Sequence, residues 1–118
     1  MSEYLHSSLA SGRWEEMDFF VQMGNIGSEI SRAEKRKKKG DFERMKNAVD
    51  RALELMDLTI LCGKNKERAG GAGSASFLKE LAREREVICD YFLFDNEYNS
   101  SGESLVKYFD QFAMAARK

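Results

Sequence analysis

The sequence predicts an all-α protein, an up-and-down four-helix bundle that forms a single domain over residues 1–118. Four segments repeat apolar residues at intervals of three and four, and no segment alternates apolar and polar residues over a useful length. The chain contains no proline, so no helix has to be kinked or stopped by one. A length of 118 residues, 42% hydrophobic and 33% charged, fits one globular domain with a modest core.

The first helix is predicted over residues 14–38, after an N-terminal extension at residues 1–12. Its apolar positions keep helical spacing from Trp14 to Ala33. The cations at its end suit the negative pole of a helix dipole, and the glycine that follows them suits a helix exit.

The middle of this helix contains small residues that form helices poorly, and their spacing still continues the helical pattern. Residues four apart lie on one face, so each pair lets a neighbouring backbone approach closely. We predict a helix-packing seam at these positions, most favourably against residues 51–60. The seam residues are Gly24, Gly27, Ser28 and Ser31.

The second helix is predicted from Phe42 to about Cys62, with Asp41 as its N-cap. Its apolar face is wide, which is typical of a central helix that contacts several neighbours. Residues 63–76 are rich in glycine and small polar residues, so we predict a flexible loop there.

The third and fourth helices complete the bundle. The third is predicted from Ser76 to Phe94, and a second loop follows at residues 95–104. Ser100 and Glu103 have the spacing of a capping box, which predicts that the fourth helix opens there.

Charged residues among apolar neighbours predict a polar network inside the bundle, because a charge near a core is costly unless it is paired. We expect Glu29 to pair with Arg51 or Arg85, and Asp57 with Arg85. The alternative is a pocket that binds a small ligand. The set comprises Asn25, Glu29, Arg51, Asp57 and Arg85.

The strongest charge feature is a run of cations near the end of the first helix. The formal net charge is −1, so only a local patch could contact nucleic acid. The alternative is a solvated helix end, and no aromatic residue interleaves with the run to stack on bases. The candidate nucleic-acid-binding residues are Arg32, Lys35, Arg36, Lys37, Lys38 and Lys39.

The residues that metal sites, catalytic sites and phosphate-binding loops usually require are missing from the sequence. The one histidine, His6, cannot supply the paired Glu-x-x-His ligands of a di-iron bundle or a catalytic base, so we predict no catalytic residues, no metal site and no cofactor. The glycines at residues 70–74 lack the Lys-Ser/Thr pair of a phosphate-binding loop. Cys62 and Cys89 form no CxxC pair and are expected to be reduced thiols.

The chain shows no sign of export or membrane insertion. Its first residues, "MSEYLHSSLASGR", lack the basic and apolar regions of a signal peptide, and no apolar run approaches about 18 residues. We therefore expect a cytoplasmic protein that does not enter a membrane.

Blocks such as "QMGNIGSEISRA" (22–33), "RALELMDLTI" (51–60) and "LKELAREREVICDYF" (78–92) resemble a family of small, uncharacterised bacterial helical proteins. In fold, the chain is loosely similar to the HEPN bundles and to proteins encoded in ribosomal RNA intervening sequences. The resemblance implies a helical bundle and no particular reaction. Active HEPN ribonucleases carry an Arg-x4–6-His motif, and no arginine precedes His6 here.

These observations favour a non-enzymatic interaction module that either self-associates as a homo-oligomer or serves a protein partner as a helper subunit. One alternative is an RNA- or DNA-associated accessory protein that uses residues 32–46. The other is a small-ligand binder or enzyme that uses the polar set inside the bundle.

Overall fold

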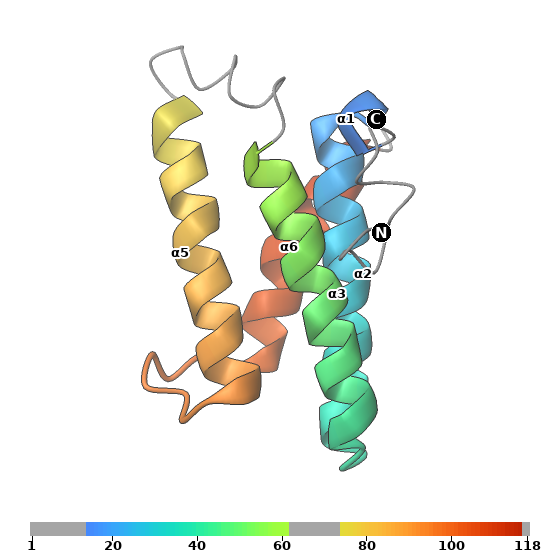
Figure 1. The fold of residues 1–118 in the computed structure, drawn as a ribbon, viewed down its shortest axis with the longest axis vertical. Coiled ribbons are helices and arrows are strands. Elements are labelled where there is room, and N and C mark those ends of the chain that lie inside the picture. The colour runs from blue at the N-terminus through green and yellow to red at the C-terminus, as the bar shows by residue number, and fades with distance from the viewer. Residues whose placement is uncertain (1–13, 62–73, 117–118) are drawn as a thin grey trace, which may run out of the picture.

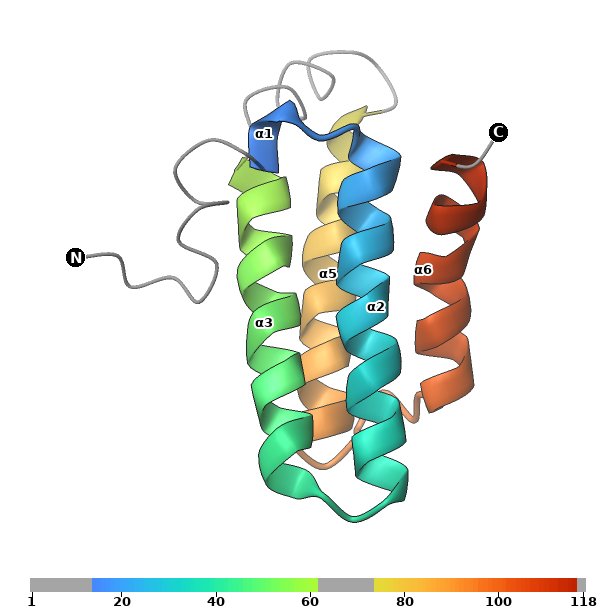
Figure 2. The ribbon, with the colours of Figure 1, turned by 90° about the vertical axis from the view of Figure 1, so that its right-hand side faces the viewer.

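The computed structural model is an all-α four-helix bundle (Figure 1). Consecutive long helices run in opposite directions, as the two perpendicular views show (Figures 1 and 2), and the described residues contain no strand. The predicted fold class is confirmed. The long helices are α2 (Phe19–Lys38), α3 (Phe42–Leu61), α5 (Ser74–Leu93) and α6 (Gly102–Ala116), and a short α1 (Trp14–Glu16) precedes them.

The structure describes residues 14–61 and 74–116. The predicted extension at residues 1–12 lies outside them, as do His6, Cys62 and all but the last three residues of the loop predicted at 63–76. None of the described helices combines the length and the apolar character needed to cross a membrane.

The first predicted helix is in fact two, and the prediction of one helix from Trp14 was wrong on this point. Asp18 has an extended backbone and its carboxylate accepts a hydrogen bond from the amide of Phe20 at 2.8 Å, so it caps a new helix. Trp14 is turned instead toward α3, where its indole N–H donates to the hydroxyl of Thr59 at 2.9 Å.

The turn from α2 to α3 follows from its sequence. Gly40 has a φ of +75°, and the amides of Gly40 and Asp41 bond back to the carbonyls of Lys37 and Arg36. This is a Schellman motif, which favours glycine at the left-handed position. The Asp41 carboxylate then accepts from the amide of Arg44 at 3.2 Å, as expected of the predicted N-cap.

The predicted start of the last helix was wrong by one residue. Ser101, and not Ser100, caps α6, because its hydroxyl accepts from the amide of Ser104 at 3.1 Å. The backbone of Ser100 is held by the side chain of Asn96, which accepts from its amide and donates to its carbonyl. Ser100 is therefore a loop residue.

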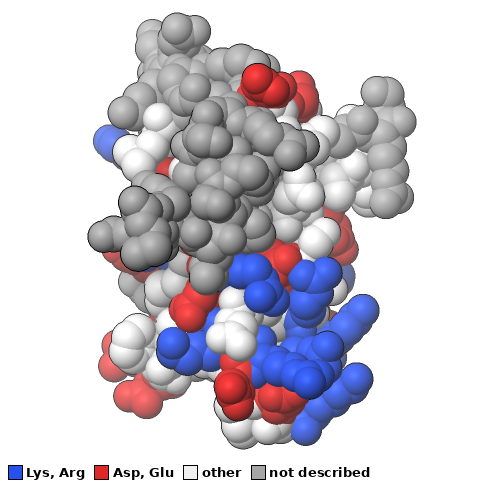
Figure 3. All heavy atoms as spheres, turned by 45° about the vertical axis from the view of Figure 1, so that its right-hand side comes forward, with Lys and Arg blue, Asp and Glu red and all other residues white. Residues whose placement is uncertain are grey.

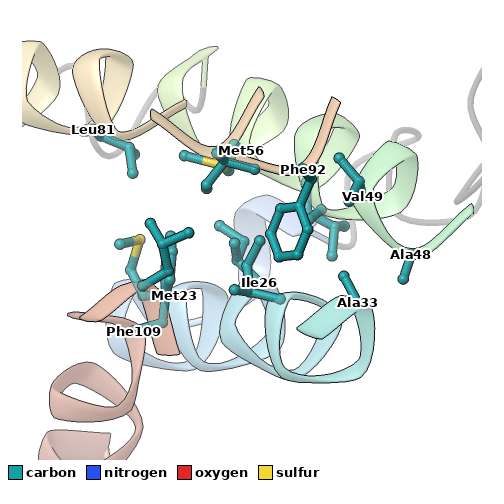
Figure 4. Packing of buried hydrophobic residues seen from close by; sticks show 14 of the residues in the cluster. Met23, Ile26, Ala33, Ala48, Val49, Met56, Leu81, Phe92 and Phe109 are labelled. Atoms are coloured by element: carbon teal, nitrogen blue, oxygen red, sulfur yellow. The ribbon is translucent and has the colours of Figure 1, made fainter. Parts of the chain in front are cut away.

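The core lies between α2 on one side and α3 and α5 on the other, with α6 closing it (Figure 4). α2 packs against both α3 and α6, and α3 packs against α5. Met23, Ile26 and Phe109 are fully buried at this centre and meet Met56 and Leu81 across it. α3 contacts α1, α2 and α5, as its wide apolar face predicted, and α2 contacts α3 and α6.

Candidate anion-binding groove

Of the predicted seam residues, Gly24 and Gly27 pack against a neighbouring helix, but that helix is α6, and Ser28 is exposed. A Cβ built on Gly27 would lie 2.7 Å from the Cβ of Phe109, and one built on Gly24 would lie 3.4 Å from that of Ala113. The predicted seam against residues 51–60 is therefore wrong in its partner. The close approach is possible because Gly27 has no side chain, and a Cβ there would overlap Phe109.

A groove of about 480 Å³ opens beside this seam. Its floor consists of small residues of α2, whose short or absent side chains leave the space empty, and cations of the next turns line it. The groove therefore brings together the small residues of the predicted seam and the cations of the basic run, which the sequence analysis treated separately. Its lining residues are Gly24, Gly27, Ser28, Ser31, Arg32, Lys35, Arg36, Lys39, Asp110 and Ala113.

The cations of the groove are largely available to a ligand. Within residues 14–61 and 74–116, no carboxylate forms an ion pair with Lys35, Arg36 or Lys39. Arg32 is held by Glu29, with 2.6 Å between its guanidinium and the carboxylate, but its side chain is still 51% exposed. Asp110 is the one carboxylate that lines the groove among the described residues.

The acidic residues of the second half of α2, Glu29 and Glu34, do not line this groove. Glu29 reaches α3, where it accepts from Arg51 at 3.0 Å. Glu34 is 7% exposed and accepts from the hydroxyl of Tyr91 on α5. The same helix therefore presents mostly cations outward, and Lys and Arg side chains gather over this end of the bundle (Figure 3).

A second groove, of about 330 Å³, continues the first toward the start of α6. The two share Ser31, Lys35 and Asp110. Among the described residues, two cations, Lys38 and Lys107, and two carboxylates, Glu34 and Glu103, line only the second groove.

Not every candidate cation faces this surface. The ammonium of Lys37 lies 3.5 Å from the centre of the Tyr91 ring and donates to the carbonyl of that residue. In α3, Arg44 pairs with Asp41 and Lys46 pairs with Asp50. The part of segment 32–46 that supplies the grooves is therefore α2 alone, without Lys37.

The polar set divides into two groups. Glu29 bridges Arg32 and Arg51, and the Asp57 carboxylate receives two hydrogen bonds from the guanidinium of Arg85, at 2.8 and 3.2 Å. The second pair links α3 to α5, and the hydrogen bond to Asp57 raises the pKa of Arg85. Asn25 bonds to the carbonyl of Val21 on its own helix, and it lines a pocket of about 310 Å³ together with Glu29 and Arg32. The five residues therefore do not form one pocket.

Several polar pairs join residues that lie far apart in the sequence, and no sequence pattern predicted them. Tyr91 bonds to Glu34, and Tyr108 on α6 donates to Glu80 on α5 at 2.9 Å. Burial and then the hydrogen bond to Glu34 raise the pKa of Tyr91 to about 12. Burial and then Glu80 raise the pKa of Tyr108. The partners are tens of residues apart, which local spacing cannot indicate.

The described residues offer little support for a metal site or a reactive thiol. Within the described ranges, no group of three or more histidine, cysteine or acidic residues is arranged to hold a metal ion. Burial raises the pKa of the Cys89 thiol, which makes it a poor nucleophile.

The exposed large hydrophobic residues are dispersed over helix ends and a loop, at Phe20, Val21, Phe42, Leu61, Phe94, Tyr98 and Met114.

Comparisons of this chain with models of protein families, with curated protein sequences and with solved structures give no match. The resemblance to a bacterial family, to HEPN bundles and to intervening-sequence proteins therefore stays a prediction. What can be said of function rests on the groove between α2 and α6.

Proposed function

We propose that this chain is a non-enzymatic binding module whose ligand is a nucleic acid, contacted through its phosphates. One observation carries the proposal: Arg32, Lys35, Arg36 and Lys39 line a single groove, and the carboxylates of Glu29 and Glu34 on the same helix are turned to other partners. Arginine and lysine provide most phosphate contacts in such complexes, and each contact releases counterions.

Self-association or a helper role, the function that the sequence favoured most, stays a prediction. The exposed hydrophobic residues are spread over α2, α3, α6 and the segment after α5, and no described helix presents them as one stripe. The small-ligand alternative loses part of its basis, because the polar set is divided between two places.

The test compares two double variants with the same loss of charge. Lys35→Gln with Arg36→Gln removes two cations from the groove, and Arg44→Gln with Lys46→Gln removes two from the exposed surface of α3. Binding of a labelled RNA is measured by fluorescence anisotropy with the full chain at low salt.

The groove variant should lose affinity by roughly tenfold or more, and the α3 variant by much less. Equal losses would assign the binding to net charge alone, and the absence of RNA binding by the wild type at low salt would contradict the proposal. The circular dichroism spectra should be unchanged in both variants, because all four side chains point outward or partly outward.

A further inference from the structure

The two grooves beside α2 form one cationic channel. They are continuous because Ser31, Lys35 and Asp110 line both. The second groove adds Lys38 from α2 and Lys107 from α6, together with the carboxylates of Glu34 and Glu103. Over both grooves, six cations and three carboxylates are among the described lining residues, so the channel keeps a net positive charge. The channel thus follows the boundary between the two helices and carries cations from both.

The channel offers little for reading or stacking bases. In the described part of the chain, no aromatic, asparagine or glutamine side chain lines either groove. Proteins that bind single strands without sequence preference stack the bases on aromatic side chains, and asparagine and glutamine are the usual partners of adenine. The arginine, lysine and serine side chains present can contact phosphates, and among the described lining residues no aromatic ring offers a platform for an unstacked base.

The spacing of the cations suits a dense and rigid row of phosphates. Arg32 to Lys39 is seven residues of helix, which is about 10 Å of rise. A duplex carries one charge per roughly 1.7 Å of its axis, so about six phosphate charges lie along that length, against about three on one strand. Fixing a rigid helix against a rigid duplex also loses less conformational freedom than ordering a flexible strand.

We infer that the channel binds the sugar–phosphate backbone of a double-stranded nucleic acid, without reading its sequence. This inference rests on the proposed function and narrows its ligand. Lys35 lies where the two grooves meet and is its central contact, with Arg32, Arg36 and Lys39 on one side and Lys38 and Lys107 on the other.

The test uses a labelled RNA strand alone and the same strand annealed to its complement, titrated with the full chain at several salt concentrations. The duplex should bind at least about threefold more tightly, and the logarithm of its affinity should fall with the logarithm of salt with a slope of about −2 to −4. A second duplex of scrambled sequence should bind equally well.

A matched variant tests the role of stacking. Phe42 is 61% exposed and is the aromatic residue nearest in sequence to the basic run. Phe42→Ala should leave both affinities unchanged, whereas Lys107→Gln should weaken duplex binding and reduce the salt slope by about 1.

The outcomes separate this inference from the proposed function. Tighter binding of the single strand, lost in the Lys35→Gln and Arg36→Gln variant, would overturn the inference and leave the proposed function standing. A loss of single-strand binding in Phe42→Ala would also overturn it. No binding of either form at low salt would overturn both.

Discussion

The hydroxyl of Tyr91 lies 3.0 and 2.9 Å from the two carboxylate oxygens of Glu34. This contact joins α5 to α2 and holds a 7% exposed carboxylate within the most basic part of the chain. A Cβ on Gly102 would collide with the same carboxylate, so α6 begins directly over it. The contact therefore joins α5 to α2 beneath the first residue of α6, and it holds the Glu34 carboxylate at the wall of the second groove.

Removing this hydroxyl should destabilise the protein at neutral pH. Tyr91→Phe leaves the ring beneath Lys37 but takes the phenolic donor from a buried carboxylate. We expect a loss of about 1–3 kcal/mol in the free energy of unfolding, measured with urea, because a buried polar group loses a partner. Phe94→Leu, at an exposed loop position, is the control. If Tyr91→Phe is as stable as the wild type, the hydrogen bond from Tyr91 to Glu34 does not contribute to stability.

The same tyrosine should make stability fall at high pH. Its pKa is raised from 10 to about 12 in the folded chain, first by burial and then by Glu34, so the folded state holds the proton more tightly than the unfolded state. The stabilisation is complete below about pH 10 and is lost as the pH rises to about 12. We expect the melting temperature to fall over this range.

Tyrosine variants can apportion that fall. The pKa of Tyr108 is also raised, first by burial, so Tyr108 should contribute to the alkaline loss as well. Tyr91→Phe and Tyr108→Phe should each flatten the dependence of the melting temperature on pH above about 10, and the double variant should flatten it most. A profile that none of these variants alters would mean that other groups cause the alkaline loss.

The two seam glycines should respond in opposite directions to alanine. Gly27→Ala places a Cβ 2.7 Å from Phe109, which is fully buried, and we expect a loss of about 1–3 kcal/mol from overpacking. Gly24→Ala adds an ordinary contact with Ala113 at 3.4 Å and removes a poor helix former, so we expect a gain of about 0.5–1 kcal/mol. Urea unfolding measures both, and equal effects would argue against the close approach of α2 and α6.

These glycines also show how far the sequence could lead. Their spacing predicted a close helix contact, and the contact exists, but spacing on one helix carries no information about the partner. The partner is decided by Phe109, more than 80 residues away in the chain. The same reason explains why the Glu34–Tyr91 and Trp14–Thr59 pairs were not predicted.

Local signals were informative where the physics is local. α3 begins at Phe42, as expected, and runs to Leu61, the last described residue of that segment, and the turn at Gly40 follows the expected pattern. The break before α2 was missed although Asp18 is a good N-cap, because Trp14 and Met17 continue the helical spacing through it. The basic run could be recognised in the sequence. The bonds of Glu29 to α3 and of Glu34 to α5 could not, because they depend on residues in other helices.

The bridge that Glu29 forms between Arg32 and Arg51 should contribute to stability. Its side chain is 12% exposed and accepts from both guanidinium groups. Glu29→Gln replaces a charged acceptor by an amide whose N–H donors face the arginines, so we expect a loss of about 1–3 kcal/mol in urea unfolding. Asp50→Asn, which breaks an exposed i,i+4 pair with Lys46, should cost less than about 0.5 kcal/mol. If both variants cost the same, the bridge adds no more than a surface ion pair.

The carboxylate of Asp110 should oppose the binding of a polyanion. Asp110 is exposed and lines both grooves, so a phosphate in the channel passes close to its charge. Two charges about 4 Å apart in water interact by roughly 1 kcal/mol, and Asp110→Asn should therefore raise the affinity for duplex RNA about threefold to tenfold at low salt.

Asp50→Asn makes the same change of net charge on α3, away from the grooves, and should raise the affinity for duplex RNA far less. The gain should disappear as salt increases, since added ions screen the repulsion that the substitution removes. Anisotropy titrations of both variants provide the measurement. Equal gains would place the ligand elsewhere on the surface, and a loss of affinity in Asp110→Asn would mean that this carboxylate helps to hold the ligand.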